Sequence, residues 1–552
     1  MLVFVGGTVR TCVGPGTIAE SIAIDHGRIV AIGRRDIVVA QAGAGAEMID
    51  LRGQTLVPGF IDAHHHLSLH VLLDGGVDCS PSVAPDLATL LARLRAEAAT
   101  LPAGAWVVGR GYSDLQLRER RHPSREELDA SCPEHPVFLY HYSCHEGVGN
   151  SRALELAGLG PSAVDPPAGR IERDRRGRVT GRLIETALCP VERLARADRL
   201  VRDRGIVDRL VRQQGELFAT GITRICDPTV PSDVMAILRA ARAGADFVLP
   251  VVMMPVSDTG YLVPPWDALE AMRPGDGPED LRVGPLKVFS DGANNCALCI
   301  RPLQLVHAFA STLAHMISRR TLAPLRLARQ TKFRYERGRL RAGIPFFTPP
   351  QLRELAQRAT ERGVELAVHA NGNDAVGIVT DALAGVGGSH RIEHCTFMTL
   401  DQCARIADAN LTAVVQPMFL QLPAFDDVPP LPGVTTIPIR SLLDAGVRVA
   451  GSSDAPVSSF DVLAAMRAAT RRKTLRGYAI CPEQAVSAEE VLAMYTREAA
   501  RACGCLDVTG TLESGKRADL VVLSADPCAT GVELDAVRVK RTILAGKTVF
   551  TA

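Results

Sequence analysis

The sequence predicts an α/β protein: a (β/α)8 TIM barrel with a small β-sandwich formed by both chain termini and an inserted α+β subdomain. Three observations predict this architecture. Helical segments that end in Gly or Asn are followed at once by short apolar runs, and several of these runs end in polar residues. The two ends of the chain instead show short alternating runs separated by turn residues.

The regular alternation of helix and strand indicates the barrel. Four segments pass from helical periodicity through a Gly or Asn into a β-branched run: LFATGITRICD, RATERGVELAVHA, ARIADANLTAVVQP and SLLDAGVRVAGSSD. Gly221, Gly363, Asn410 and Gly446 fit the left-handed position just past a helix C-terminus, and the runs after them fit buried strands. FVLPVVMMP, GPLKVFSDG, HRIEHC and LVPGFIDAHHH bring the strand candidates to eight, the number in a closed parallel barrel.

Both ends of the chain differ from its middle. Residues 1–57 contain SIAIDHGRIVAIG, and residues 500–552 contain ADLVVLS and VKRTILAGKTVF, which are typical of hairpin strands. Neither piece is large enough to cover its own sheet, so we expect both to form one composite β-sandwich. The barrel then occupies residues 58–80 and 200–499. Residues 81–199, too long for a usual βα connection, form the inserted α+β subdomain.

Composition excludes several classes of protein. A chain of 552 residues has room for three or four units at roughly 150 residues each. Lys+Arg 62 against Asp+Glu 61 gives a net charge of +1, so no overall positive field attracts nucleic acid. With 47% hydrophobic residues the chain forms an ordinary globular core. We therefore expect a small-molecule substrate and no nucleic-acid partner.

The sequence also predicts a cytoplasmic protein without membrane attachment. The start, MLVFVGGTVRTC, lacks the basic region and cleavage site of a signal peptide. The apolar stretch 247–256 is about half a membrane span and contains two prolines. The 14 cysteines are scattered along the chain, which favours free thiols in a reducing compartment. The pair Cys296 and Cys299 has no second pair to complete a zinc ribbon.

The motif PGFIDAHHHL is the strongest indication of chemistry. On an extended strand His64 and His66 point to the same side, so both can reach one metal ion, whereas His65 points away. A histidine cluster after a strand is more often structural than functional when it stands alone. Here it is joined by polar residues at other strand ends.

Those residues are Lys287 in LKVFSDG, His369 in LAVHANG, His394 in RIEHC and Asp454 in GSSDAP. Each has a structural reading: the lysine can extend to solvent, the histidines can be hydrogen-bonded core residues, and the aspartate can cap a helix. Hydrogen bonding within a core does not readily explain why so many polar residues converge on the C-terminal mouth of one barrel, whereas a bound metal ion does.

In their order these motifs resemble the amidohydrolase superfamily, with GxxADLVVL at residues 515–523 as a closing motif. KVFSDG, VHANGNDAV, RIEHC and GSSDAPV, with the long insertion after the first strand, resemble amidohydrolase family 3, in the branch of the N-substituted formamide deformylases. The resemblance spans essentially the whole chain and implies a metal-dependent hydrolase that cleaves a non-peptide carbon–nitrogen bond in an amide, an N-substituted formamide or a cyclic amide.

The resemblance implies two divalent metal ions. Zinc is expected, with Mn, Fe or Co as alternatives. The first ion would be held by His64, His66 and Asp454, the second by His369 and His394, and Lys287, carboxylated by CO2, would bridge them. In the implied mechanism a metal-bridging hydroxide attacks a carbonyl and Asp454 acts as the general base.

Substrate contacts are less evident in the sequence. HYSCHEGVGNSRAL resembles a family segment that places His145 near the pocket as a carbonyl donor, and Asp291 is expected to orient a ligand. Asn294, Asn295 and Cys296 depart from the family pattern, and the Arg-rich segment 300–345 lengthens the separation between two strands. These departures leave the substrate open.

Two alternatives remain. A mononuclear deaminase of the same superfamily lacks the lysine ligand, so Lys287 argues against it. A non-catalytic scaffold homologue loses metal ligands, whereas all six positions here carry competent residues. A homodimer is the oligomeric state that the resemblance suggests.

Overall fold

The computed structural model describes residues 1–552 except 261, 274, 293–295, 320–332 and 428–430. Its centre is built from parallel strands in two sheets, whose order follows the chain. The first sheet has the order β17-β16-β15-β8 and the second β18-β22-β23-β25-β27. The strands are β8 (Phe60–Asp62), β15 (Ile222–Val230), β16 (Val251–Pro255), β17 (Leu281–Val283), β18 (Leu286–Phe289), β22 (Leu366–Ala370), β23 (Arg391–His394), β25 (Thr412–Val415) and β27 (Arg448–Gly451).

All eight predicted strands are present, but their pairing does not form one closed ring in the described residues. The predicted strand GPLKVFSDG contains β18, and a further short strand that was not predicted, β17, comes directly before it; β17 pairs with β16 and β18 with β22. Gly284 and Pro285 lie at the break, and proline has no N–H to donate to a ladder. The other edge strands of the two sheets are β8 and β27, and there the Ala63 N–H donates to the Gly451 carbonyl at 3.3 Å.

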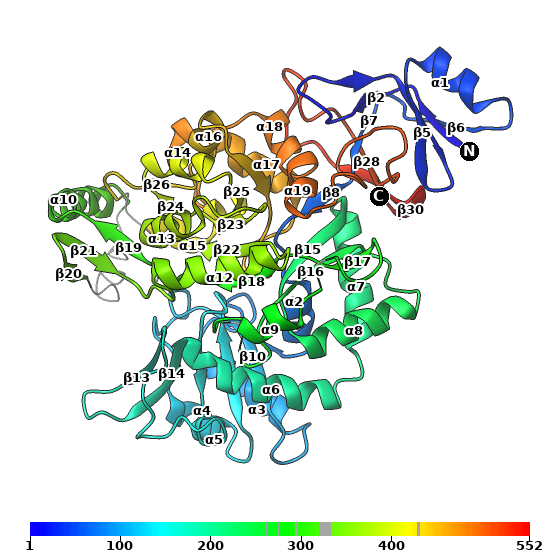
Figure 1. Cartoon of the computed structure of the whole chain (residues 1–552). Coiled ribbons are helices and arrows are strands. Elements are labelled where there is room, and N and C mark those ends of the chain that lie inside the picture. Colours follow the sequence, from blue (N-terminus) through cyan, green and yellow to red (C-terminus); the bar gives the residue numbers. More distant parts are fainter. Residues whose placement is uncertain (261, 274, 293–295, 320–332, 428–430) are drawn as a thin grey trace.

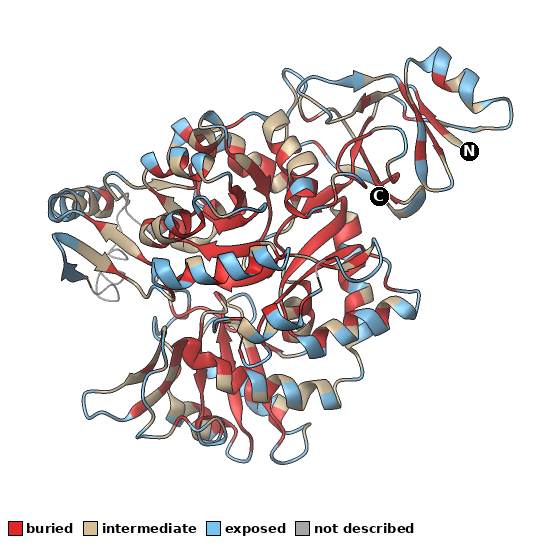
Figure 2. Ribbon diagram, viewed as in Figure 1, coloured by how far each residue is buried: buried red, intermediate tan, exposed pale blue. Residues whose placement is uncertain are grey.

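Helices follow most of these strands, as the alternation predicts (Figure 1). Gly221, Gly363, Asn410 and Gly446 all have positive φ, between 53° and 84°, where the chain leaves a helix for a strand. The helices are α2 (Leu67–Asp74), α7 (Ile206–Ala219), α8 (Ser232–Ala243), α9 (Trp266–Ala271), α12 (Pro349–Glu361), α13 (Asn373–Leu383), α14 (Asp401–Asp408), α16 (Ile439–Asp444), α17 (Val462–Arg471), α18 (Ala488–Met494) and α19 (Arg497–Ala502). In Figure 2 the parallel strands are buried and the helices expose their outer faces.

The two ends of the chain meet in a separate lobe, where both termini lie (Figure 1). A six-stranded sheet, β3-β2-β7-β28-β29-β30, joins strands from both ends, and a four-stranded sheet, β5-β4-β1-β6, lies beside it. Phe4 and Ile24 of the smaller sheet share an apolar cluster with Leu56 and Leu520 of the larger. The elements are β1 (Leu2–Val5), β2 (Thr8–Arg10), β3 (Ile18–Ala19), β4 (Ser21–Asp25), β5 (Arg28–Gly33), α1 (Arg35–Ala42), β6 (Glu47–Asp50), β7 (Thr55–Pro58), β28 (Leu520–Leu523), β29 (Val539–Leu544) and β30 (Lys547–Thr551).

The long connection after β8 contains a six-stranded mixed sheet of its own, in the order β13-β14-β12-β11-β10-β9. Helices pack around it, and two apolar clusters form its core. Its elements are β9 (Val77–Asp78), α3 (Leu87–Ala98), β10 (Val107–Tyr112), α4 (Arg125–Ser131), β11 (Val137–His141), β12 (Glu146–Gly149), α5 (Ser151–Leu156), β13 (Gly169–Arg173), β14 (Val179–Glu185) and α6 (Cys189–Arg202). This body lies against one side of the parallel strands in Figure 1.

The segment after β18 forms a small protruding unit (Figure 1). Helix α10 (Pro302–Arg319) is followed by a hairpin of β20 (Arg334–Glu336) and β21 (Arg339–Ala342), which pairs with β19 (Leu298–Ile300). Much of the Arg-rich segment, residues 320–332, lies outside the described residues.

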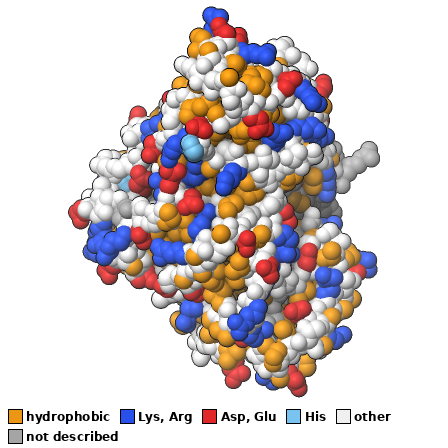
Figure 3. Space-filling model, turned by 90° about the vertical axis from the view of Figure 1, so that its right-hand side faces the viewer, with side chains coloured by type: hydrophobic (Ala, Val, Ile, Leu, Met, Phe, Trp, Pro, Cys, Tyr) orange, Lys and Arg blue, Asp and Glu red, His pale blue; other side chains and the backbone are white. Residues whose placement is uncertain are grey.

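Positive and negative side chains are intermixed over the face in Figure 3, in keeping with the net charge of +1. No described helix has the length and apolar character needed to cross a membrane.

Candidate metal centre

Two loops at the carboxyl ends of neighbouring strands bring the first group of predicted ligands together. His64 and His66 follow β8, and Asp454 follows β27. The Asp454 N–H donates to the His64 carbonyl at 2.8 Å, and the His66 N–H donates to the Ala455 carbonyl at 2.9 Å. These reciprocal backbone bonds fix the two loops against each other.

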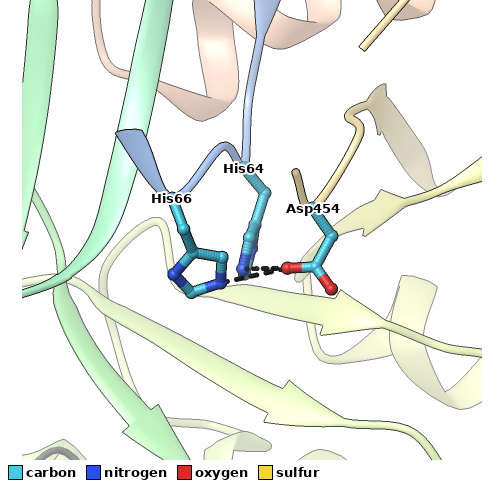
Figure 4. A group of neighbouring side chains, drawn as sticks. All are labelled: His64, His66 and Asp454. Carbon is cyan, nitrogen blue, oxygen red and sulfur yellow. Dashed lines mark hydrogen bonds and ion pairs between the residues drawn. The ribbon is translucent and has the colours of Figure 1, made fainter. Parts of the chain in front are cut away.

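The side chains of these three residues converge on one point (Figure 4). Nε2 of His66 lies 3.0 Å and Nε2 of His64 3.3 Å from Oδ1 of Asp454. Their potential ligand atoms all lie within 4.8 Å of one another, and no other described group of three His, Cys, Asp or Glu residues meets that condition. Two imidazoles and a carboxylate are a donor set that suits zinc and other divalent ions.

The far ring nitrogen of each of these histidines has a partner. Nδ1 of His64 lies 2.5 Å from Oε2 of Glu393, and Nδ1 of His66 lies 3.0 Å from Oγ1 of Thr229. The Thr229 hydroxyl itself donates to the Pro228 carbonyl at 2.6 Å, so it accepts from His66. With the proton held on Nδ1, each Nε2 presents a lone pair to the centre, as metal-ligating histidines require.

The other two predicted histidines repeat this arrangement. Nδ1 of His369 lies 3.0 Å from Oδ1 of Asp291, and Nδ1 of His394 lies 3.0 Å from Oε1 of Gln416. The rings of His369 and His394 are 4.5 Å apart, and that of His394 is 5.0 Å from the ring of His64. The structure therefore gathers all four histidines into one cluster, and Asp291 makes the orienting contact expected of it.

Lys287 lies inside this cluster. Its Nζ is 3.3 Å from Nε2 of His64, and the residue is only 1% exposed. Burial lowers the pKa of Lys287 to about 8, despite the nearby carboxylates of Glu393 and Asp454. An amine with a lowered pKa has a larger neutral fraction near pH 7, which is the form that reacts with CO2.

The electrostatic setting favours neutral imidazoles around an ionised carboxylate. Burial lowers the pKa of His66 to about 4, and it holds the pKa values of His369 and His394 well below their usual range. Burial acts in the opposite direction on Asp454, but its contacts with His64 and His66 outweigh burial and keep its pKa well below the usual value. These are the protonation states in which the groups bind a cation.

A buried ion pair between Arg391 and Glu393 contacts His64 on the Nδ1 side of its ring. Arg391 binds the Glu393 carboxylate through Nε at 2.5 Å and Nη2 at 2.9 Å, and its Nη2 also donates to the Ala63 carbonyl at 2.6 Å. Burial opposes ionisation of Glu393, but Arg391 and His64 outweigh it and lower its pKa. Glu393 is thus an ionised acceptor for the Nδ1–H of His64.

His145 reaches the same region from the inserted body. Its ring lies 5.4 Å from that of His369 and 6.0 Å from that of Phe289. Nδ1 of His145 is 2.7 Å from Oε2 of Glu185, a residue with no exposed surface. Burial would lower the pKa of His145, but the Glu185 carboxylate raises it. All seven predicted site residues therefore lie around one centre.

Apart from Asp291, the residues that orient the histidines were not predicted from the sequence. Glu393 stands one position before His394 inside the recognised motif RIEHC, so its place on a strand end was a usable signal. Thr229 lies near the end of β15 and Gln416 directly follows β25, but threonine and glutamine are common at such positions for many reasons. Glu185 ends a strand of the insertion, and nothing in its local sequence marks it.

The fold and the donor set define a class of protein: an α/β protein with a candidate divalent-metal site at the carboxyl ends of parallel strands. The chain belongs to the amidohydrolase family, whose model matches residues 47–550. It is 32% identical to the N-substituted formamide deformylase of Arthrobacter pascens, over 99% of this chain and 97% of that protein.

Two solved structures share the fold. An uncharacterized metal-dependent hydrolase from Pyrococcus horikoshii matches with a TM-score of 0.71 and 21% identity, over 97% of this chain and 99% of that one. A second, from Pyrococcus furiosus, matches with a TM-score of 0.67 and 23% identity, over 96% and 100%. The family and the deformylase relative identify the chain as a hydrolase acting on carbon–nitrogen bonds other than peptide bonds.

Proposed function

We propose that the protein is a metal-dependent amidohydrolase that cleaves the carbon–nitrogen bond of a small amide, with N-substituted formamides as the first substrates to test. The relative's name supplies the substrate class. The residues proposed to hold two divalent ions, zinc before Mn, Fe or Co, are His64, His66, Lys287, His369, His394 and Asp454.

One observation supports this proposal above the others. All four histidines have Nδ1 within 3.0 Å of a hydrogen-bond acceptor on another residue: Glu393, Thr229, Asp291 and Gln416. Core histidines have no reason to share one tautomer and to gather in one cluster, whereas a metal cluster needs both. A carboxylated Lys287 beside Nε2 of His64 would add an anionic oxygen donor between the two histidine pairs.

Divalent ions, when bound, supply a water of lowered pKa and positive charge beside the carbonyl oxygen of the substrate. Oδ1 of Asp454 lies within 3.3 Å of Nε2 of both His64 and His66, and Asp454 is proposed to accept a proton and return it to the leaving nitrogen. His145 is proposed to donate a hydrogen bond to the carbonyl oxygen.

The proposal includes the architecture and the location of the enzyme. The barrel is assigned to residues 58–80 and 200–499, the composite β-sandwich to residues 1–57 and 500–552, and the inserted subdomain to residues 81–199. The split between β17 and β18 at Pro285 then interrupts a (β/α)8 barrel. All 14 cysteines are free, which supports a cytoplasmic location.

The test measures formate and amine release from a panel of N-substituted formamides. We expect turnover by the purified protein, loss of turnover after chelation, and recovery on adding zinc or manganese. Ammonia release from a heterocyclic amine would favour a deaminase instead. Full activity of chelated protein that contains no metal by elemental analysis would overturn the proposal.

A further inference from the structure

His145 and Glu185 are joined twice, although 40 residues separate them in the chain. The Glu185 N–H donates to the His145 carbonyl at 2.9 Å, and the His145 Nδ1–H donates to Oε2 of Glu185 at 2.7 Å. The backbone bond alone would hold the His145 loop against the end of β14. Attachment of the loop therefore does not require the side-chain hydrogen bond, which calls for another role.

The backbone of Glu185 adopts an unusual conformation that directs its side chain. Its φ and ψ are 53° and −129°, and residues other than glycine rarely adopt positive φ. Strained conformations of this kind cluster at functional sites, because the surrounding structure must hold them in place. Here the strain falls on a residue with no exposed surface whose carboxylate faces the His145 ring.

Gly292 leaves the space that the Glu185 carboxylate occupies. A Cβ atom at position 292 would lie 2.0 Å from Oε1 and 2.5 Å from Cδ of Glu185. The φ of Gly292 is outside the positive range, so its conformation does not by itself call for glycine. Glycine is required at position 292 because any side chain there would occupy the space of the Glu185 carboxylate. Gly292 directly follows Asp291, the residue that orients His369, so one segment serves both histidines.

We infer that Glu185 is a positioning residue of the reaction: it accepts the Nδ1–H of His145 and so aims the Nε2 of that ring at the substrate's carbonyl oxygen. Because Glu185 holds Nδ1, the plane of the ring is fixed, and Nε2 is the ring nitrogen left to serve as the donor to the substrate. The position of the ring, beside His369 and Phe289, places that donor next to the metal cluster. This inference rests on the proposed function.

The principal test compares the kinetics of three variants on a formamide substrate. We expect Glu185→Gln, which keeps the shape but removes the charge, to lower kcat about 100-fold with little change in KM, as loss of one oxyanion donor does. Gly292→Ala should reproduce this effect, because its methyl group displaces the carboxylate without altering either partner. Glu172→Gln, on β13 of the same sheet, is the matched control and should keep the wild-type rate.

Combining variants separates positioning from a structural role. A Glu185→Gln, His145→Gln double variant should be no slower than His145→Gln alone, because both changes remove the same contact. Multiplied effects, a loss of metal content in Glu185→Gln, or wild-type kcat in that variant would each overturn the inference while leaving metal-dependent hydrolysis intact.

A second measurement does not depend on activity. In protein labelled with ¹⁵N-histidine, a hydrogen-bonded Nδ1–H of His145 gives a low-field proton resonance that is absent from His145→Gln. We expect this resonance to shift in both Glu185→Gln and Gly292→Ala and to stay unchanged in Glu172→Gln. An unchanged resonance in Glu185→Gln would overturn the inference even if no formamide proved to be a substrate.

Discussion

Nδ1 of His64 lies 2.5 Å from Oε2 of Glu393, and Arg391 binds the same carboxylate from the other side. Arg391 also donates to the carbonyl of Ala63, the residue before His64. The chain thus fixes both the backbone and the ring of His64, the first proposed metal ligand, through one buried ion pair. A buried ion pair seldom stabilises a fold by itself, so its use here points to precise orientation.

Replacing Glu393 with Gln should weaken metal binding. The amide can still contact Nδ1 of His64, but it lacks the charge that makes the ring a stronger ligand, and loss of such orienting partners lowers metal affinity roughly 10- to 100-fold. Titration against a competing chelator measures the change. Glu365→Gln, a neighbouring acid outside the cluster, is the control, and equal affinity in both variants would contradict the role of Glu393.

Replacing Lys287 with Met should reduce the metal content. If the carboxylated lysine bridges two ions, elemental analysis should find about two ions per wild-type chain and about one in the variant. The exposed Lys473→Met serves as the control and should keep the wild-type count. Two ions retained in Lys287→Met would show that the histidines and Asp454 suffice.

Replacing Asp454 with Asn should leave the fold intact and remove most turnover. The amide keeps a ligand oxygen but cannot accept a proton, and general-base groups contribute about 10²- to 10⁴-fold to a rate. The pH-independent rate on a formamide substrate measures the loss of turnover, and circular dichroism of the same sample shows whether the fold is intact. A near-wild-type rate would assign the base to another group.

Two glycine substitutions test the packing beneath the site. At Gly59, just before β8, a Cβ would lie 2.1 Å from Oγ1 and 2.8 Å from Cβ of Thr223, so Gly59→Ala should lower the free energy of unfolding by about 1–3 kcal/mol. Gly215 lies within α7 with nothing within 4 Å of a Cβ. Gly215→Ala should therefore raise that free energy by about 0.5–1 kcal/mol. Urea denaturation measures both, and destabilisation of equal size would contradict the packing argument.

Features set by short-range rules could be predicted from the sequence. Gly221, Gly363, Asn410 and Gly446 adopt the left-handed conformation expected at the ends of helices. Nε2 of His64 and Nε2 of His66 lie near one oxygen of Asp454, as the spacing of the two residues predicted, although both histidines follow β8 and do not lie on it. The pairing of the two chain ends in one sheet followed from the size that a sheet needs.

Features set by long-range contacts could not. Pro285 was visible in the sequence, but whether it splits a strand depends on the partners on either side. Glu185 and His145 meet only because a strand of the insertion ends beside the His145 loop. The clamp formed by Arg391, Glu393 and Ala63 likewise spans more than 300 positions, and no local pattern encodes it.

Anomalous diffraction at the zinc edge, from crystals grown with zinc, tests the central claim most directly. The account predicts a peak coordinated by Nε2 of His64, Nε2 of His66 and the Asp454 carboxylate, with a second peak beside His369 and His394. An enzyme that hydrolyses its substrate while showing no anomalous peak at the first position would contradict it.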